Sequence, residues 1–216
     1  MLRFRFILYV TLLIRCIGFA QNDSSLYFPE KPIKEGIFLT YEDFRNSRSI
    51  PKEQLISDKN RERVEFISKT LLQEKFSYRV NETIVTVESK RVWGFYQGNT
   101  FYINYNGEFY RIPVFGSICF LVANVKVVSP SVYDPRFGYI GSVSTTETRE
   151  FIMNFYEGNI TEFTQYKVET LLSLDKQIYE EFKKLSRRKQ KQQTYRYIRK
   201  YNEAHPVYFL IEKPQR

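Results

Sequence analysis

The sequence is poor in the residues that bind metals and carry out catalysis. It has one histidine, His205, and two cysteines, Cys16 and Cys119, among 216 residues. A protein metal site needs three or four ligands at usable spacing, and the aspartates and glutamates of this chain form no cluster that supplies them. Nucleotide-binding loops and known catalytic motifs are also absent from the sequence. It therefore predicts no metal, no cofactor and no catalytic residue.

The N-terminus contains a short apolar run with a characteristic pattern of residues around it. Residues 1–20 combine early arginines, a short apolar run and small residues at the spacing that a signal peptidase reads before Gln21. The apolar run ends at Arg15 and is shorter than the ~20 residues that span a bilayer. We expect an exported protein, periplasmic or secreted, with no transmembrane span after cleavage. A membrane anchor and lipid attachment at Cys16 are the weaker alternatives, because Arg15 disfavours both.

Cleavage after residue 20 leaves Cys119 as the only cysteine, so no disulfide forms within the chain. Cys119 lies in the apolar run SICFLVANV, which is typical of a buried strand. A Cys119–His205 dyad is the available nucleophile and base, but a thiol in apolar surroundings is inert. We expect Cys119 to be a core residue.

The composition is typical of one globular domain, with 43% hydrophobic and 17% aromatic residues. Residues 21–35 are polar, contain two prolines and predict a tether. The domain over 36–216 is predicted to be α+β, with an antiparallel β-meander sheet packed against C-terminal helices. Its segments are a β-rich part over 76–163, a helical part over 164–204 and a last strand over 207–211.

Shorter segments have patterns of their own. A strand is expected from Gly36 to Leu39, followed by a helical turn in which the Thr40 side chain accepts a hydrogen bond from the amide of Asp43. Residues 45–64 are interpreted as a polar link. Prolines and glycines over 129–150 predict a long irregular loop.

Two turn signals fold the stretch VWGFYQGNTFYINYNGEFYRI into three strands. Asn106-Gly107 favours a type I′ hairpin in which Ile103 pairs with Tyr110. Gly98-Asn99 favours a second hairpin, which pairs Gly94 with Ile103. The alternation of side chains then predicts two faces. The first face comprises Val92, Gly94, Tyr96, Phe101, Ile103, Tyr110 and Ile112. The second comprises Trp93, Phe95, Tyr102, Asn104, Phe109 and Arg111.

The second face is a candidate binding surface because it mixes large aromatic rings with polar groups. Its candidate ligand contacts are Trp93, Phe95, Tyr102, Phe109 and Arg111. The alternative is structural: sheets in small domains commonly bury one face and cover part of the other with aromatic side chains. We favour the structural interpretation, in which the helix around Ile178 or the chain near Phe38 and Phe44 covers these rings.

Positive charge is concentrated in one segment near the C-terminus. Nine basic and no acidic residues lie between Lys183 and Lys200, in a chain whose formal net charge is +9. The segment follows a helix that Asp175 is expected to cap and whose Ile178, Phe182 and Leu185 face the sheet. Residues 186–194 are all polar and are expected not to face a core. The candidate contacts with an anionic surface are Lys183, Lys184, Arg187, Arg188, Lys189 and Lys191.

Two functional hypotheses remain from the residues alone. The first is a non-enzymatic, envelope-associated binding or structural protein whose basic helix contacts an anionic envelope component or a protein partner. Export argues against nucleic acid as the partner. The alternative is that the basic residues form an ordinary solvent-exposed helix face without a binding role. The second is a hydrolytic enzyme that uses the loop over 133–138, with Asp134 and Arg136, above the aromatic face. The sequence does not identify a ligand.

Four segments carry a resemblance to a known family. They are GIFLTYEDFRNSRSIP, RVWGFYQGNTFYI, GEFYRIPVFGSICF and the stretch from LLSLDKQIYEEF to HPVYF. In this order they cover most of the predicted mature chain, and they resemble a family of uncharacterised secreted proteins from Bacteroidetes bacteria. The resemblance implies export across an inner membrane. It supplies no activity and no functional residue.

Overall fold

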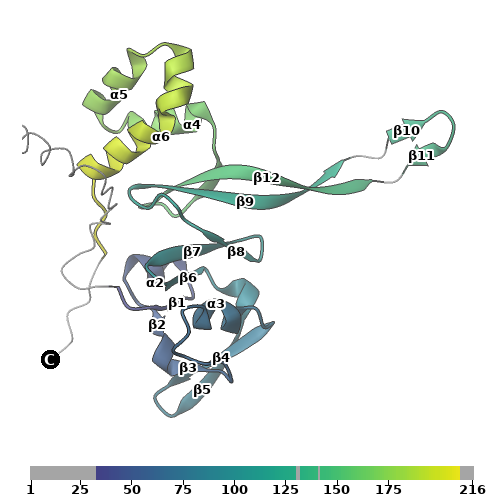
Figure 1. Cartoon of the computed structure of the whole chain (residues 1–216), viewed down its shortest axis with the longest axis vertical. Coiled ribbons are helices and arrows are strands. Elements are labelled where there is room, and N and C mark those ends of the chain that lie inside the picture. Colours follow the sequence, from purple (N-terminus) through teal and green to yellow (C-terminus); the bar gives the residue numbers. More distant parts are fainter. Residues whose placement is uncertain (1–32, 130–131, 141, 210–216) are drawn as a thin grey trace, which may run out of the picture.

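The computed structural model describes residues 33–129, 132–140 and 142–209, which form antiparallel sheets and helices. The predicted α+β class is confirmed, with C-terminal helices packed against a sheet (Figure 1). The predicted signal peptide and residues 21–32 of the predicted tether lie outside the described residues. Glu35, at the end of that tether, belongs to the domain, because its carboxylate accepts from the amide of Gly98 at 2.7 Å and contacts Lys52 Nζ at 3.1 Å.

A five-stranded antiparallel sheet occupies the middle of the chain, in the order β2-β1-β6-β7-β8. Both predicted hairpins are present, with Gly94 opposite Ile103 and Ile103 opposite Tyr110. All four turn residues have positive φ, as type I′ turns require. The strands are β1 (Gly36–Phe38), β2 (Ile50–Pro51), β6 (Gly94–Gln97), β7 (Thr100–Tyr105) and β8 (Glu108–Arg111).

A second sheet of three strands covers one face of the first. It consists of β3 (Leu55–Ile56), β4 (Lys75–Val80) and β5 (Thr83–Glu88), and the helix α3 (Phe66–Leu71) packs beside it. Three short elements connect these parts: the 3₁₀ turns η1 (Lys52–Gln54) and η2 (Ser89–Arg91) and the helix α2 (Tyr41–Arg45). The predicted polar link over 45–64 is therefore wrong in part, because β2, η1 and β3 lie within it. These elements are too short to show a periodic pattern.

The third sheet extends into an arm that leaves the body of the molecule (Figure 1). Its long strands β9 (Ile118–Ser129) and β12 (Val143–Asn154) pair over their full length, and β13 (Ile160–Glu162) joins β12 near the body. The tip is the hairpin of β10 (Val132–Asp134) and β11 (Gly138–Ile140). The predicted irregular loop over 129–150 is wrong, because most of it is extended and paired backbone.

Three helices cover the far face of the third sheet: α4 (Gln165–Leu172), α5 (Lys176–Lys183) and α6 (Arg187–Ala204). The predicted packing of α5 is confirmed, since buried Ile178 and Phe182 lie in one cluster with Phe120 and Ile152 of the sheet. The predicted caps are also present. The amide of Ile178 donates to Asp175 Oδ1 at 2.9 Å, and the amide of Asp43 donates to Thr40 Oγ1 at 3.0 Å.

Two residues of the polar stretch over 186–194 are buried in the core, contrary to prediction, while most of the stretch is exposed. Gln190 is 6% exposed and Thr194 is 2% exposed. Gln190 Nε2 donates to the carbonyls of Phe182 and Leu185 at the end of α5, and Thr194 Oγ1 donates to the Gln190 carbonyl at 2.7 Å. Buried polar side chains are tolerated where hydrogen bonds satisfy them. A buried helix face made of polar residues cannot be recognised from the spacing of apolar residues in the sequence.

One side chain near the end of α6 makes two hydrogen bonds to the third sheet. Asn202 Nδ2 donates to the carbonyl of Ile118, and the amide of Ile118 donates to Asn202 Oδ1, both at 2.8 Å. The carboxamide thus takes the place of a neighbouring strand at this edge of β9. Beyond the helix, Val207 and Phe209 are buried in the central core but form no strand. The predicted strand over 207–211 is wrong for its described residues, and 210–211 lie outside them.

A hydrogen bond between His205, at the end of α6, and Asp175, the N-cap of α5, makes stability depend on pH. His205 Nε2 lies 2.8 Å from Asp175 Oδ2. The hydrogen bond from the Ile178 amide, followed by the contact with His205, holds the pKa of Asp175 below its ordinary value. A lowered carboxylate pKa stabilises the fold above the pKa of the unfolded chain, and this contribution is lost as pH falls through the folded value.

We expect Asp175→Asn to lower the free energy of urea unfolding at pH 7, although asparagine still caps the helix. The difference from the natural chain should shrink as pH falls below about 4, the ordinary range of an aspartate pKa. Urea titrations of both proteins at several pH values measure it. A difference that stays constant down to pH 2 would contradict the role of this charge.

Candidate functional site

The predicted aromatic binding face is mostly packed inside the protein. Phe95 on β6 is 1% exposed, its ring stacks on Tyr102 at 4.5 Å, and the ring of Phe109 meets it edge-on at 5.2 Å. Phe66 of α3 and Phe76 of β4 lie in the same cluster. The second sheet and α3 therefore cover these rings. The predicted cover by α5 is wrong. Of the chain near Phe38 and Phe44, Ile37 and Leu39 lie in this cluster, whereas Phe38 and Phe44 lie in the central one.

Trp93 lies on the opposite side of the sheet from Phe95, contrary to prediction. It packs against the central cluster, where its ring stacks on Phe44 at 4.3 Å, as the structural interpretation expected for this residue. Val92, assigned to the other face, lies instead in the cluster of Phe95. The reason is that β6 begins at Gly94, after the η2 turn, so strand alternation does not extend back to these two residues.

Arg111 is the charged member of the candidate face, and it reaches solvent. It lies at the end of β8 opposite Tyr102, as predicted, and is exposed. Because the neighbouring aromatic rings are buried or half-buried, the structure does not bring Arg111 and the rings together around an open groove. This arrangement fits packing rather than ligand binding.

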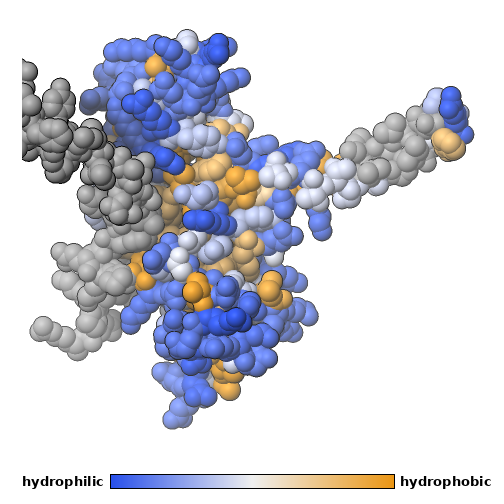
Figure 2. Space-filling model, in the orientation of Figure 1, coloured by the Kyte–Doolittle hydropathy of each residue, from blue (hydrophilic) through white to orange (hydrophobic). Residues whose placement is uncertain are grey.

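A cluster of cations lies where α5 ends and α6 begins. We call the exposed residues Lys184, Arg187, Arg188, Lys189 and Lys191 the basic surface. Lys184 ends α5, and the others occupy the first turns of α6. The helical end of the molecule is mostly hydrophilic surface (Figure 2). All five were candidate contacts with an anionic surface in the sequence, and all five are exposed. That they bind such a surface stays a prediction.

The sixth candidate, Lys183, is engaged elsewhere. Its Nζ contacts Glu169 Oε2 of α4 at 2.9 Å, and this hydrogen bond raises the pKa of Lys183. Two more carboxylates lie nearby in sequence: Glu180 contacts Lys176 at 4.0 Å, and Glu181 forms an ion pair with Lys200. Within the described part of the chain, no carboxylate forms an ion pair with a member of the basic surface.

The placement of these cations works against helix stability. The first turn of α6 contains Arg187, Arg188 and Lys189 but no acidic residue, and the Ser186 side chain makes no capping hydrogen bond. The N-terminus of a helix carries partial positive charge, so cations there are unfavourable by some tenths of a kcal/mol each. Cations that lower helix stability and have no acidic partners indicate a role in binding another molecule.

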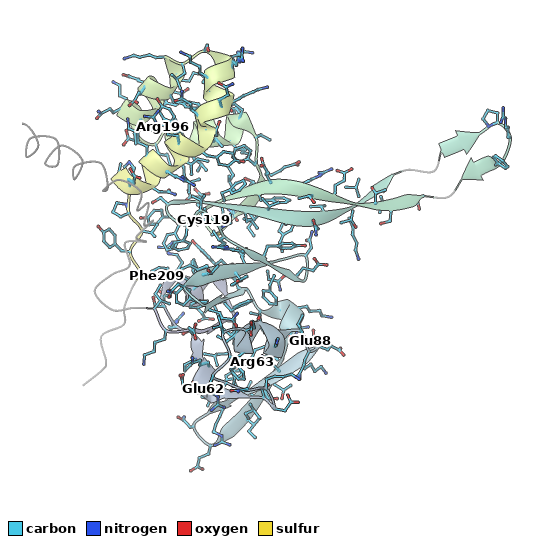
Figure 3. The ribbon with its side chains drawn as sticks, viewed as in Figure 1. Glu62, Arg63, Glu88, Cys119, Arg196 and Phe209 are labelled. Carbon is cyan, nitrogen blue, oxygen red and sulfur yellow. The ribbon has the colours of Figure 1, made fainter. Side chains whose placement is uncertain are left out.

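The candidate dyad of Cys119 and His205 does not exist. Cys119 is fully buried at the body end of β9 (Figure 3), its thiol donates to the Gly116 carbonyl, and burial raises its pKa to about 12. The His205 ring faces Asp175 instead. Cys119 is a core residue, as predicted.

The predicted catalytic loop is far from the aromatic face. The turn over 135–137 lies at the tip of the arm, whereas β6, β7 and β8 lie in the body (Figure 1). The continuous pairing of β9 with β12 carries the tip outward. The arrangement that the hydrolase hypothesis requires is therefore not formed.

Among the described residues, no group of three or more histidine, cysteine, aspartate or glutamate side chains is placed to hold a metal ion. None of the described helices has the length and apolar character that crossing a membrane requires. Comparisons with protein families, with curated proteins and with solved structures return no match. The function is therefore inferred from the residues and the structure of this chain alone.

Proposed function

We propose that this chain is an exported, non-enzymatic binding protein of the cell envelope, and that the basic surface binds the phosphate groups of anionic envelope lipids. The observation that carries the proposal is the set of five exposed cations, without acidic partners among the described residues, where α5 ends and α6 begins. The N-terminal signal pattern and the family resemblance support export.

Lipid phosphates fit this surface better than a small ligand does. The cations are exposed on the helical end of the molecule, so they are accessible to a charged layer. Each lysine or arginine near an anionic membrane contributes about 1 kcal/mol to binding. Five of them give useful affinity without any apolar insertion, and the binding weakens as salt screens the charges.

Sedimentation with lipid vesicles tests the proposal. The full chain should bind vesicles that contain phosphatidylglycerol, bind phosphatidylcholine vesicles much less, and dissociate at high salt. Replacing Arg187, Arg188 and Lys189 together by glutamine should weaken binding to the anionic vesicles on the order of 100-fold, from about 1 kcal/mol per cation. Because these cations oppose the helix dipole, the free energy of unfolding should stay equal or rise.

A charge-matched control separates a local surface from net charge. Lys69, Lys75 and Arg79 are exposed on α3 and β4, and their replacement by glutamine removes the same three charges. This control should bind anionic vesicles like the natural chain. Equal weakening by both triple variants, or no binding of the natural chain to anionic vesicles, would contradict the proposal. A chain that binds a protein partner but no anionic vesicles would also contradict the proposal.

A further inference from the structure

The outer edge of β12 is bare along the arm. On its inner edge β12 pairs with β9 from Val143 to Asn154. On its outer edge β13 pairs only with residues 151–153, and the Phe163 amide donates to the Glu150 carbonyl at 2.8 Å. Toward the tip from Glu150, none of the strands in the described part of the chain lies beside this edge (Figure 1).

The bare edge presents a regular row of backbone groups. In an antiparallel strand, successive residues direct their N–H and C=O groups to alternate sides. Because the Glu150 carbonyl points to β13, the backbone groups of Ser144, Thr146 and Thr148 point to the same outer side. The side chains over 144–148 are exposed. This stretch can accept an added strand without rearrangement.

This edge lacks three of the usual protections, and its charged residues Glu147 and Arg149 form an ion pair with each other. Natural edge strands are blunted by proline, by bulges or by short length. Here β9 and β12 are 12 residues each, contain no proline or glycine, and pair one to one without a bulge. A two-stranded ribbon is marginally stable in water by itself. A long ribbon with an unprotected edge therefore indicates a partner strand.

We propose that the partner is β12 of a second copy of this chain, paired antiparallel about a two-fold axis at Thr146. In this register Thr146 lies opposite Thr146 of the other copy, and Ser144 lies opposite Thr148. The pairing then spans the bare stretch and stops where β13 begins. The two arms form one four-stranded sheet in the order β9-β12-β12-β9.

The side chains of this edge suit pairing with themselves. Pairs of serine and threonine hydroxyls across antiparallel strands are favourable. Glu147 and Arg149 neutralise each other within one copy, with Arg149 Nη2 at 2.9 Å from Glu147 Oε2. Two copies of the edge therefore approach without net repulsion. A register centred on Glu147 would place two like charges directly opposite, which selects against it.

Proline at the two-fold axis tests the pairing. The Thr146 amide points away from β9, so Thr146→Pro removes a donor of the outer edge and leaves the ladder with β9 intact. Sedimentation equilibrium should show a dimer for the natural full chain and for Thr146→Val, and a monomer for Thr146→Pro. A natural chain that is monomeric over the concentration series, or a dimer that Thr146→Pro leaves unchanged, overturns the proposal.

A cross-linking experiment fixes the register and does not depend on the proline variant folding. Opposed residues of a hydrogen-bonded antiparallel pair have Cα atoms about 5.5 Å apart, within disulfide range. Thr146→Cys should therefore give a disulfide-linked dimer on oxidation. Arg149→Cys is the control, because about 20 Å separates it from its counterpart in this register. Linkage at 149 and not at 146 overturns the register.

Discussion

Replacing Phe44 by alanine should lower the free energy of unfolding by about 3–5 kcal/mol, the cost of truncating a large core aromatic side chain. Phe44 is fully buried and lies at the centre of an aromatic cluster. Its ring meets those of Phe38, Trp93, Phe101, Phe115, Phe155 and Phe209 at centroid distances from 4.3 to 6.1 Å.

The effect should be large because Phe44 packs against several separate segments of the chain at once. It comes from α2, a helix of five residues, which is too short to be stable without tertiary contacts. Its partners come from β1, β7, the end of β12 and the C-terminal segment at Phe209. A cavity at this position removes contacts from all of them together.

Urea unfolding followed by circular dichroism measures the change. Phe137→Ala is the matched control, because this phenylalanine at the tip of the arm is 79% exposed and its loss should change stability by less than about 0.5 kcal/mol. A loss below about 1 kcal/mol for Phe44→Ala would contradict its position at the centre of the core.

Replacing Phe95 by alanine should also cost about 3–5 kcal/mol. Phe95 is packed between the five-stranded sheet and the elements that cover it, in contact with Tyr102 and Phe109. A side chain in a ligand site would cost far less to remove, since its ring would be partly open to water. The same substitution thus separates the packing and binding interpretations of this face.

Arg111→Ala is the control on the same sheet. Arg111 is exposed at the end of β8, so its removal should leave the free energy of unfolding nearly unchanged. Thermal and urea unfolding of both variants give the comparison. Equal and small effects of the two substitutions would show that Phe95 is not a core residue.

Features set by neighbouring residues could be predicted. The hairpin at Asn106-Gly107 follows from two residues that accept positive φ, and the cap at Asp175 follows from one side chain three residues before an amide. The packing face of α5 follows from its apolar period. Each of these depends on a few positions close together in the chain, so the pattern and the structure agree.

Features set by distant partners could not be predicted. The side on which Trp93 lies depends on where β6 begins, which the contact of the Trp93 amide with the carbonyls of Phe38 and Leu39 decides. The burial of Gln190 depends on the end of a different helix. Prolines and glycines suggested a loop over 129–150, but the pairing of β12 with β9 and of β10 with β11 made most of it strand.

For the candidate sites, the sequence by itself determined which cations are concentrated between Lys183 and Lys200, because charge is a property of the residue. Only the tertiary structure decided that Glu169 engages Lys183, whereas the five members of the basic surface form no ion pair with a carboxylate of the described residues. It alone also showed that the aromatic face is covered and that one edge of β12 is bare. Exposure depends on what packs against a residue, and those partners come from elements far away in the chain.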